Sequence, residues 1–122
     1  MPVRSFEDLQ VYQLAERLSD IIWEVVLNWD SLARDTVGKQ LIRAMDSVGA
    51  NIAEGTGRGT YQDNRRFVRI ARGSLYEVRH WLRRAHARGL LDTSHVKSTK
   101  PLLDELAPKL NAYLRSIGPI EQ

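Results

Sequence analysis

Apolar side chains recur at steps of three and four residues through four segments of this 122-residue chain. This spacing places them on one side of an α-helix, and nothing alternates with the period of two that a half-buried strand requires. Short connections between the segments predict an all-α fold, an antiparallel up-and-down four-helix bundle forming a single domain over residues 1–122. The predicted helices run from about Phe6 to Trp29, Asp35 to Glu54, Thr60 to Arg88, and within Thr93 to Ile117.

The first predicted helix, with Ser5 as its expected N-cap, carries two apolar sides. Its main stripe consists of Val11, Leu14, Ala15, Leu18, Ile22, Val25, Val26 and Trp29. At about 100° per residue, Tyr12, Trp23 and Leu27 fall on a different side. The second apolar side predicts the interface of a homo-oligomer, and the alternative is a single deeply embedded helix.

Glycine and proline set the expected ends of the other helices. Gly55 is expected to end the second helix in a left-handed conformation, and Thr60 is expected to cap the third. Pro101 suits a first helical turn after Thr99 as the cap, which leaves residues 93–98 as a separate turn. Pro108 lies inside the last apolar pattern and predicts a kink.

The third predicted helix combines a core stripe with a row of arginines. The core positions are expected at Phe67, Ala71, Ser74, Val78, Trp81 or Leu82, and Ala85. On the opposite side lie Arg65, Arg69, Arg72, Arg79 and Arg83, with Tyr61, Tyr76 and His80 on or beside them. Arginines interleaved with aromatic rings suit phosphate contact and base stacking. The alternative is a solvated surface, or one paired with the acidic first helix of a neighbouring subunit.

The charge distribution supports an anionic partner. The net charge is only +3, but residues 1–35 sum to −4, residues 36–91 to +7, and residues 92–122 to zero. Fourteen of the eighteen cations are arginine, whose planar fork matches phosphate and carboxylate. The chain has no cysteine, no signal-peptide pattern and no apolar run long enough for a bilayer, which predicts a soluble cytoplasmic protein without membrane contact.

Candidates for catalysis are few. His80, His86 and His95 form no metal-binding helical pair, and Ser47 and Ser74 have no nucleophile motif around them. Glu54 and Glu77 are expected to approach each other across the second and third helices, as part of a polar network. The sequence therefore predicts no catalytic residue, no metal and no cofactor, and an unrecognised enzyme is the weakest hypothesis.

The GTGRG stretch at residues 55–59 differs from the glycine motifs that hold phosphate, and it follows a helix instead of a strand. We expect a turn whose glycines supply unusual backbone angles. Its second predicted use is to bring Arg58 to the positive N-terminus of the third helix, where an anion would be stabilised.

Three stretches carry a family resemblance: SFEDLQVYQLA, KQLIRAMDSVGANIAEGTGRG and RFVRIARGSLYEV. They resemble the bacterial four-helix-bundle proteins encoded in intervening sequences of large-subunit ribosomal RNA genes, once classed as ribosomal proteins. The resemblance covers roughly residues 5 to 91. It implies a ring-like homo-oligomer, usually a pentamer, without catalytic activity. It also implies kinship with the accessory variability determinant of diversity-generating retroelements, a basic pentamer that binds nucleic acid and a reverse transcriptase.

Five residues occupy the motifs of that family. Asn51, Glu54 and Gly55 lie in its N-I-A-E-G, while Gly73 and Ser74 form its G-S pair. Glycine inside a helix costs up to about 1 kcal/mol against alanine, so Gly73 is expected where two helices approach closely. Asn51 and Glu54 would then cap or hydrogen-bond across that contact.

Two function hypotheses remain from different classes. The first is a non-enzymatic, pentameric protein that binds nucleic acid, RNA before DNA, through Arg58, Arg65, Arg69, Arg72, Tyr76, Arg79 and Arg83. The second is a protein-interaction scaffold that docks an acidic partner such as a reverse transcriptase. The sequence leaves open the natural partner, the biological process and the oligomer number.

Overall fold

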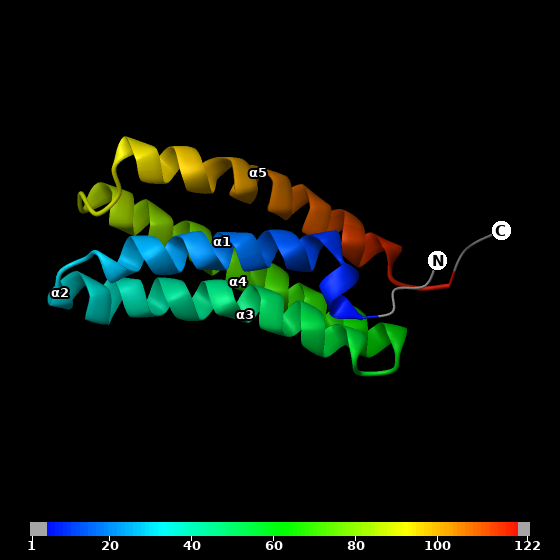
Figure 1. Ribbon diagram of the computed structural model, residues 1–122. Coiled ribbons are helices and arrows are strands. Elements are labelled where there is room, and N and C mark those ends of the chain that lie inside the picture. The colour runs from blue at the N-terminus through cyan, green and yellow to red at the C-terminus, as the bar shows by residue number, and fades with distance from the viewer. Residues whose placement is uncertain (1–4, 120–122) are drawn as a thin grey trace.

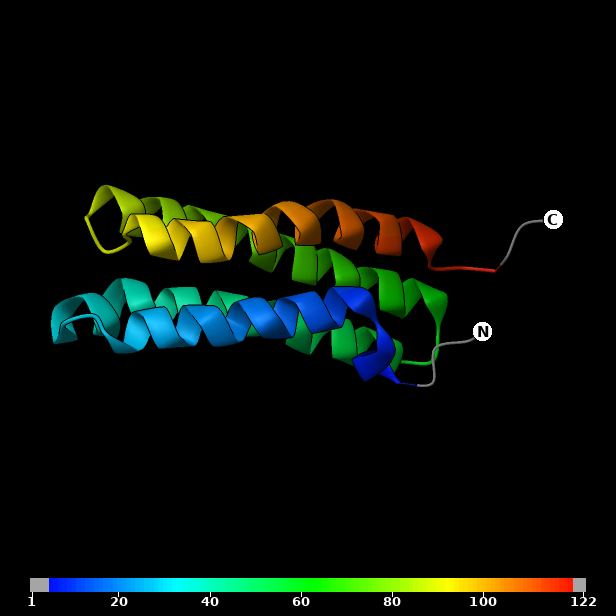
Figure 2. The same ribbon diagram turned by 45° about the horizontal axis from the view of Figure 1, so that its top comes forward.

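The computed structural model describes residues 5–119, and four long helical columns make up most of it (Figures 1 and 2). A short 3-10 turn, η1 (Phe6–Asp8), precedes α1 (Gln10–Leu27). The second column joins α2 (Ser31–Ala33), the π-helical turn η2 (Arg34–Gly38) and α3 (Lys39–Thr56). The last two columns are α4 (Tyr61–Ala87) and α5 (Thr93–Ser116).

The columns form an antiparallel up-and-down bundle, as the sequence predicts (Figures 1 and 2). Helix α1 packs against α3 and α5, and α4 packs against the same two helices, so α1 and α4 lie diagonally across the bundle. The turns after α1 and after α4 share one end of the bundle. The turn between α3 and α4 lies at the other end, where the described chain also begins and ends.

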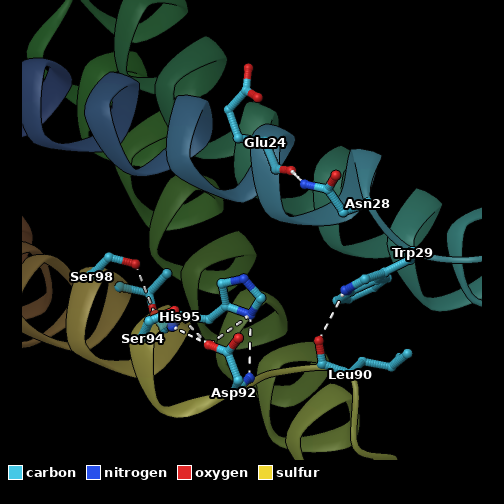
Figure 3. Close-up of polar contacts among 9 residues, drawn as sticks. Glu24, Asn28, Trp29, Leu90, Asp92, Ser94, His95 and Ser98 are labelled. Carbon is cyan, nitrogen blue, oxygen red and sulfur yellow. Dashed lines mark hydrogen bonds and ion pairs between the residues drawn. The ribbon is translucent and has the colours of Figure 1, made fainter.

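The main stripe of α1 is buried as predicted, from Val11 to Trp29. The Trp29 indole also donates a hydrogen bond from Nε1 to the carbonyl of Leu90 at 3.0 Å, which ties the two turns at that end together (Figure 3). The expected start of the helix is wrong. Ser5 donates to the Glu7 carboxylate at 2.9 Å instead of capping the backbone, and the α-helix begins only at Gln10.

The second helical column is longer than predicted at both ends. It begins at Ser31 instead of Asp35, because the Asp30 carboxylate accepts a hydrogen bond from the backbone N–H of Ala33 at 3.0 Å. It ends at Thr56, so Gly55 is a buried helical residue and the left-handed ending expected there is wrong. Gly59, with φ of 89°, supplies the left-handed backbone of the turn.

Helix α4 is capped by Thr60, as predicted, whose hydroxyl accepts from the N–H of Asp63 at 3.1 Å. Its core stripe is displaced from the prediction. Ala71, Val78, Leu82 and Ala85 are buried as expected, but Val68 and Leu75 take the places assigned to Phe67 and Ser74, which are half-buried. The buried stripe is therefore rotated around α4, and the helix presents a different side to α5 than the sequence suggested.

Helix α5 contradicts the prediction of a separate turn before a Thr99 cap. The helix is continuous from Thr93 to Ser116, with Pro101 and Pro108 inside it. Asp92 caps its first turn, accepting from the N–H of His95 at 2.9 Å, while His95 Nδ1 accepts from the N–H of Asp92 at 3.2 Å (Figure 3). Thr99 is buried in the helix interior and donates to the His95 carbonyl at 2.8 Å.

Candidate nucleic-acid interface

The five arginines Arg65, Arg69, Arg72, Arg79 and Arg83 form the arginine stripe of α4. This stripe lies beside the seam, the line along which α4 packs against α5, instead of pointing directly away from the core. Arg65 donates from Nη1 to the carbonyl of Ile117 at 2.8 Å, and Arg72 donates from Nη1 to Asn111 Oδ1 at 3.2 Å. Both arginines are half-buried by these contacts, which fasten the C-terminal half of α5 to α4. The predicted position on the side opposite the core, where an arginine would stay in water, is therefore wrong for these two.

The accessible part of the stripe consists of Arg69, Arg79 and Arg83. All three are exposed, and none makes an ion pair within residues 5–119. The Tyr76 ring is 58% exposed beside them, with the Arg79 guanidinium carbon 5.9 Å from the ring centroid. Free guanidinium groups next to an exposed ring can contact a phosphate and stack a base.

The glycine-rich corner between α3 and α4 is a turn, and its arginine has partners within the chain. Arg58 forms an ion pair with Glu54, with 3.6 Å between Nη1 and Oε1, and its guanidinium carbon lies 5.2 Å from the Phe67 ring centroid. This ion pair also explains the outward-facing position of Glu54. The anion contact predicted for Arg58 would have to compete with Glu54, and it stays a prediction.

The two glycines of the family motifs have opposite surroundings. A Cβ on Gly55 would lie 2.5 Å from Asn64 Oδ1 and 3.2 Å from Phe67 Cβ, so α3 and α4 approach each other closely at this point. A Cβ on Gly73 would meet nothing within 4 Å in the described part of the chain. The close approach predicted at Gly73 is therefore wrong for the single chain, and Gly55 is the residue that permits one.

A small polar network crosses from α3 to α4. Ser74 Oγ lies 2.9 Å from Ser47 Oγ, and Asn51 Nδ2 donates to the Ser47 carbonyl at 2.8 Å and to Ser47 Oγ at 2.9 Å. Ser74 thus lies at the edge of the core, opposite α3, and not at its centre. The network satisfies polar groups that are partly removed from water.

Glu54 and Glu77 do not meet, contrary to the prediction. Because α3 and α4 are antiparallel and Ser47 lies opposite Ser74, the two glutamates are separated by about 15 Å along the bundle axis at 1.5 Å per residue. Glu77 Oε2 instead accepts a hydrogen bond from Trp81 Nε1 at 3.0 Å and lies 3.9 Å from Arg43 Nη2. Within residues 5–119, no three histidine, aspartate or glutamate side chains are arranged to hold a metal ion.

The residues predicted for the oligomer interface differ in exposure. The Tyr12 ring packs edge-on against Phe6, with 4.8 Å between centroids, and burial together with Glu16 raises the pKa of its hydroxyl. Trp23 and Leu27, by contrast, are 50% and 48% exposed. Tyr12 is thus largely engaged within its own chain, and the interface stays a prediction that rests on Trp23 and Leu27.

The charges are segregated across the bundle. Exposed acidic residues line α1 at Glu16, Asp20 and Glu24, and Asp46 of α3 lies beside them. Partial burial and the charge of Asp20 raise the pKa of the Asp46 carboxyl, although a hydrogen bond with Ser19 opposes the shift. The acidic residues of α1 and the arginine stripe of α4 thus lie on two helices that are diagonal to each other in the bundle (Figure 2). None of the helices within residues 5–119 is both long and apolar enough to cross a membrane.

Comparison with known proteins agrees with this fold. The family described as 23S rRNA-intervening sequence protein matches residues 7–112. Among solved structures, a crystal structure of a Bacteroides thetaiotaomicron protein matches with a TM-score of 0.71 and 18% sequence identity, covering 88% of this chain and 100% of that one. That protein is described as one with unknown function from the S23 ribosomal protein family, and at this identity the likeness shows the fold alone. No curated protein matches the chain.

Proposed function

The chain belongs to the 23S rRNA-intervening sequence protein family, and from this premise we propose that it is a non-enzymatic homo-oligomer that binds RNA through the arginine stripe of α4. Neither the family nor the similar crystal structure is described by a catalytic activity. The kinship with the accessory variability determinant of diversity-generating retroelements, and with it the reverse-transcriptase partner, remains a prediction from the sequence resemblance.

One observation carries the proposal: Arg69, Arg79 and Arg83 are exposed and unpaired within residues 5–119, with the Tyr76 ring exposed among them. Cations that merely solubilise a helix usually alternate with acidic side chains, which form ion pairs three or four residues away. Arg69, Arg79 and Arg83 form no such ion pairs in the described chain. Guanidinium groups held on a rigid helix can therefore contact phosphates without first losing a salt bridge.

We further propose a ring-like, pentameric assembly in which Trp23 and Leu27 lie between subunits. Each subunit of a ring would present one arginine stripe, and linked binding sites raise the overall affinity far above that of a single site. In this ring the arginine stripe lies outside the subunit contacts, because a contact with the acidic α1 of the next subunit would cover the guanidinium groups that bind the RNA.

The test replaces Arg69, Arg79 and Arg83 together by glutamine. Structured RNA, single-stranded RNA and duplex DNA are titrated with parent and variant at several salt concentrations. We expect weaker binding to every nucleic acid and a smaller dependence of log K on log salt, by up to about three. The control replaces three exposed cations that lie outside α4, Arg17, Arg34 and Lys39, by glutamine; of these, Arg34 is paired with Asp35.

Arg65 and Arg72 are left intact, because replacing them would also remove their hydrogen bonds to Ile117 and Asn111. Equal losses in the test variant and the control would show that only net charge matters. Absence of nucleic-acid binding by the parent at low salt would overturn the proposal and favour an acidic protein as the partner.

A further inference from the structure

A groove of about 420 Å³ lies in the seam between α4 and α5, at the end of the arginine stripe. Its floor is apolar and is formed by Leu82 of α4, Leu91 of the connecting turn, and Val96 and Leu103 of α5. Three of these side chains are only half-buried, so the groove exposes apolar surface to water. The volume falls within the range of about 300–1,000 Å³ typical of small-molecule sites.

The rim of this groove is basic. Arg79 and Arg83 line it from α4, and Lys100 lines it from α5. Lys100 Nζ lies 2.7 Å from Asp104 Oδ2, so this pair contributes little net charge, while the two arginines are unpaired within residues 5–119. The hydroxyl of Thr99, which also lines the groove, is already used in a bond to the His95 carbonyl. The groove thus combines apolar walls with unpaired cations at its mouth.

Arg79 joins this groove to a second, smaller depression. That depression is lined by Arg72, Tyr76 and Arg79 of α4 and by Ala107 and Asn111 of α5. Arg79 and Arg83 follow Tyr76 at steps of three and four residues, so the ring and the two arginines occupy successive turns on one side of α4. A ligand lying along the seam would therefore meet an aromatic ring, then two cations, then an apolar slot.

We infer that this seam binds single-stranded nucleic acid, with an unpaired base in the apolar groove and its flanking phosphates on Arg79 and Arg83. The inference rests on the proposed function and specifies the form of nucleic acid. In a duplex the bases are stacked and paired, so only phosphates and groove edges reach a protein surface. Unpaired bases can turn outward, enter an apolar slot and stack on a ring such as Tyr76. A surface for duplex alone would have no use for the apolar floor.

The capping box of α5 positions one wall of the groove. The reciprocal hydrogen bonds between Asp92 and His95 fix the first turn of α5, which leads directly into Val96 and Thr99 (Figure 3). The hydrogen bond from the Trp29 indole to the Leu90 carbonyl fixes the turn next to Leu91 against the segment that follows α1. The slot is therefore built from fixed elements, as a site that holds the flat face of a base against apolar side chains requires.

The experiment measures fluorescence anisotropy of a short oligouridine and of a duplex RNA of equal length, with parent protein, Leu103→Arg and Tyr76→Leu. Leu103→Arg adds a cation while its stem fills the slot. If a base occupies the groove, the affinity of Leu103→Arg for oligouridine should fall at least about fivefold despite the added charge, whereas its affinity for duplex RNA should be unchanged or higher. Tyr76→Leu leaves the charge unchanged and should reduce the affinity for oligouridine by a similar factor without changing the affinity for duplex RNA. Leu32→Arg, at a position that is 76% exposed and does not line the groove, is the charge-matched control.

The outcomes separate this inference from the proposed function. If Leu103→Arg and Leu32→Arg both strengthen binding of both RNAs, the stripe binds phosphates only and the base site is wrong. Unchanged oligouridine binding by Tyr76→Leu would equally overturn it. If the parent binds neither RNA at low salt, the proposed function itself fails. Since Leu103 is half-buried, thermal melts check that Leu103→Arg folds, and exposed Tyr76 provides the test if it does not.

Discussion

Two glycines that share a helical setting have different physical roles in this protein. Gly55 is buried between α3 and α4, where an added methyl group would collide with Asn64 and Phe67. Gly73 is exposed in the middle of α4, with open space where its side chain would be in the described chain. The first glycine is required by packing within one chain. The second costs helix stability without any gain visible in a single chain.

Alanine substitutions at these positions should have opposite effects. Gly55→Ala should destabilise the protein by about 1–3 kcal/mol, because the backbone of Asn64 and the Cβ of Phe67 would have to move. Gly73→Ala should stabilise it by up to about 1 kcal/mol, the difference in helix propensity between the two residues. Thermal melts of the two variants beside the parent measure both effects. Stabilisation by both substitutions would show that the Gly55 contact relaxes at no cost.

The arginines of α4 show what a single-helix pattern can and cannot predict. The spacing correctly placed them on one side of a helix, and Arg69, Arg79 and Arg83 are exposed as expected. The spacing could not show that Arg65 and Arg72 hydrogen-bond to Ile117 and Asn111. Those partners lie 52 and 39 residues later in the chain, at the end of α5 and within it, and their proximity exists only after the bundle has formed.

At the scale of elements, α5 shows how a cap determines where a helix begins. The usual sequence signature pairs the capping residue with glutamate or glutamine three residues later. Here histidine takes that place, and its Nδ1 serves as the acceptor. Because histidine is not part of that signature, the sequence pattern favours Thr99 before Pro101 as the cap and not Asp92. A continuous α5 would have placed Lys100, Asp104 and Asn111 on one side, and with them the second wall of the seam.

The cap gives a pH-dependent prediction. Hydrogen bonds from Ser94 and from the His95 backbone lower the pKa of the Asp92 carboxyl from its ordinary 3.8. A lowered pKa means that the folded state favours the charged form, so the stabilisation is complete above 3.8 and is lost as the pH falls below it. Asp92→Ala should therefore lower the melting temperature at pH 7, and the difference from the parent should narrow below pH 3.8.

Thermal melts of parent and Asp92→Ala across the acid range check this prediction. Asp104→Ala is the control, since that carboxylate lies on the same helix but makes an exposed ion pair instead of a cap. A difference that stays constant through the acid range would show that the charge of Asp92 does not contribute to capping.

At the scale of the whole molecule, the exposed apolar side chains of α1 predict self-association. Trp23 and Leu27 keep about half of their surface in water in the single chain, which is unfavourable unless another subunit covers them. Light scattering of the parent should give a mass several times 14.0 kDa, five times if the ring is a pentamer. Trp23→Glu combined with Leu27→Glu should reduce it toward the single-chain value.

The control for this dissociation is Leu32→Glu, which introduces one glutamate, against two in the test variant, at a residue that is 76% exposed. The interface assignment would be wrong if the control disassembles the oligomer as completely, or if the parent itself scatters as a single chain.

The fold of one subunit could be predicted from the sequence because each helix buries its own stripe. The assembly could not, because it depends on which exposed side chains a second copy covers.

The π-helical turn at Arg34–Gly38 has a consequence for how the length of this chain can vary. The N–H of Lys39 donates to the carbonyl of Arg34, five residues earlier, so this turn contains one residue more than an α-helical turn. Deleting one residue here would turn the column from Ser31 to Thr56 into a uniform α-helix without rotating either flank relative to the core. An aligned homologue with a single-residue gap at this point would therefore have the same bundle, whereas the same gap in the middle of α4 would rotate the arginine stripe out of the seam.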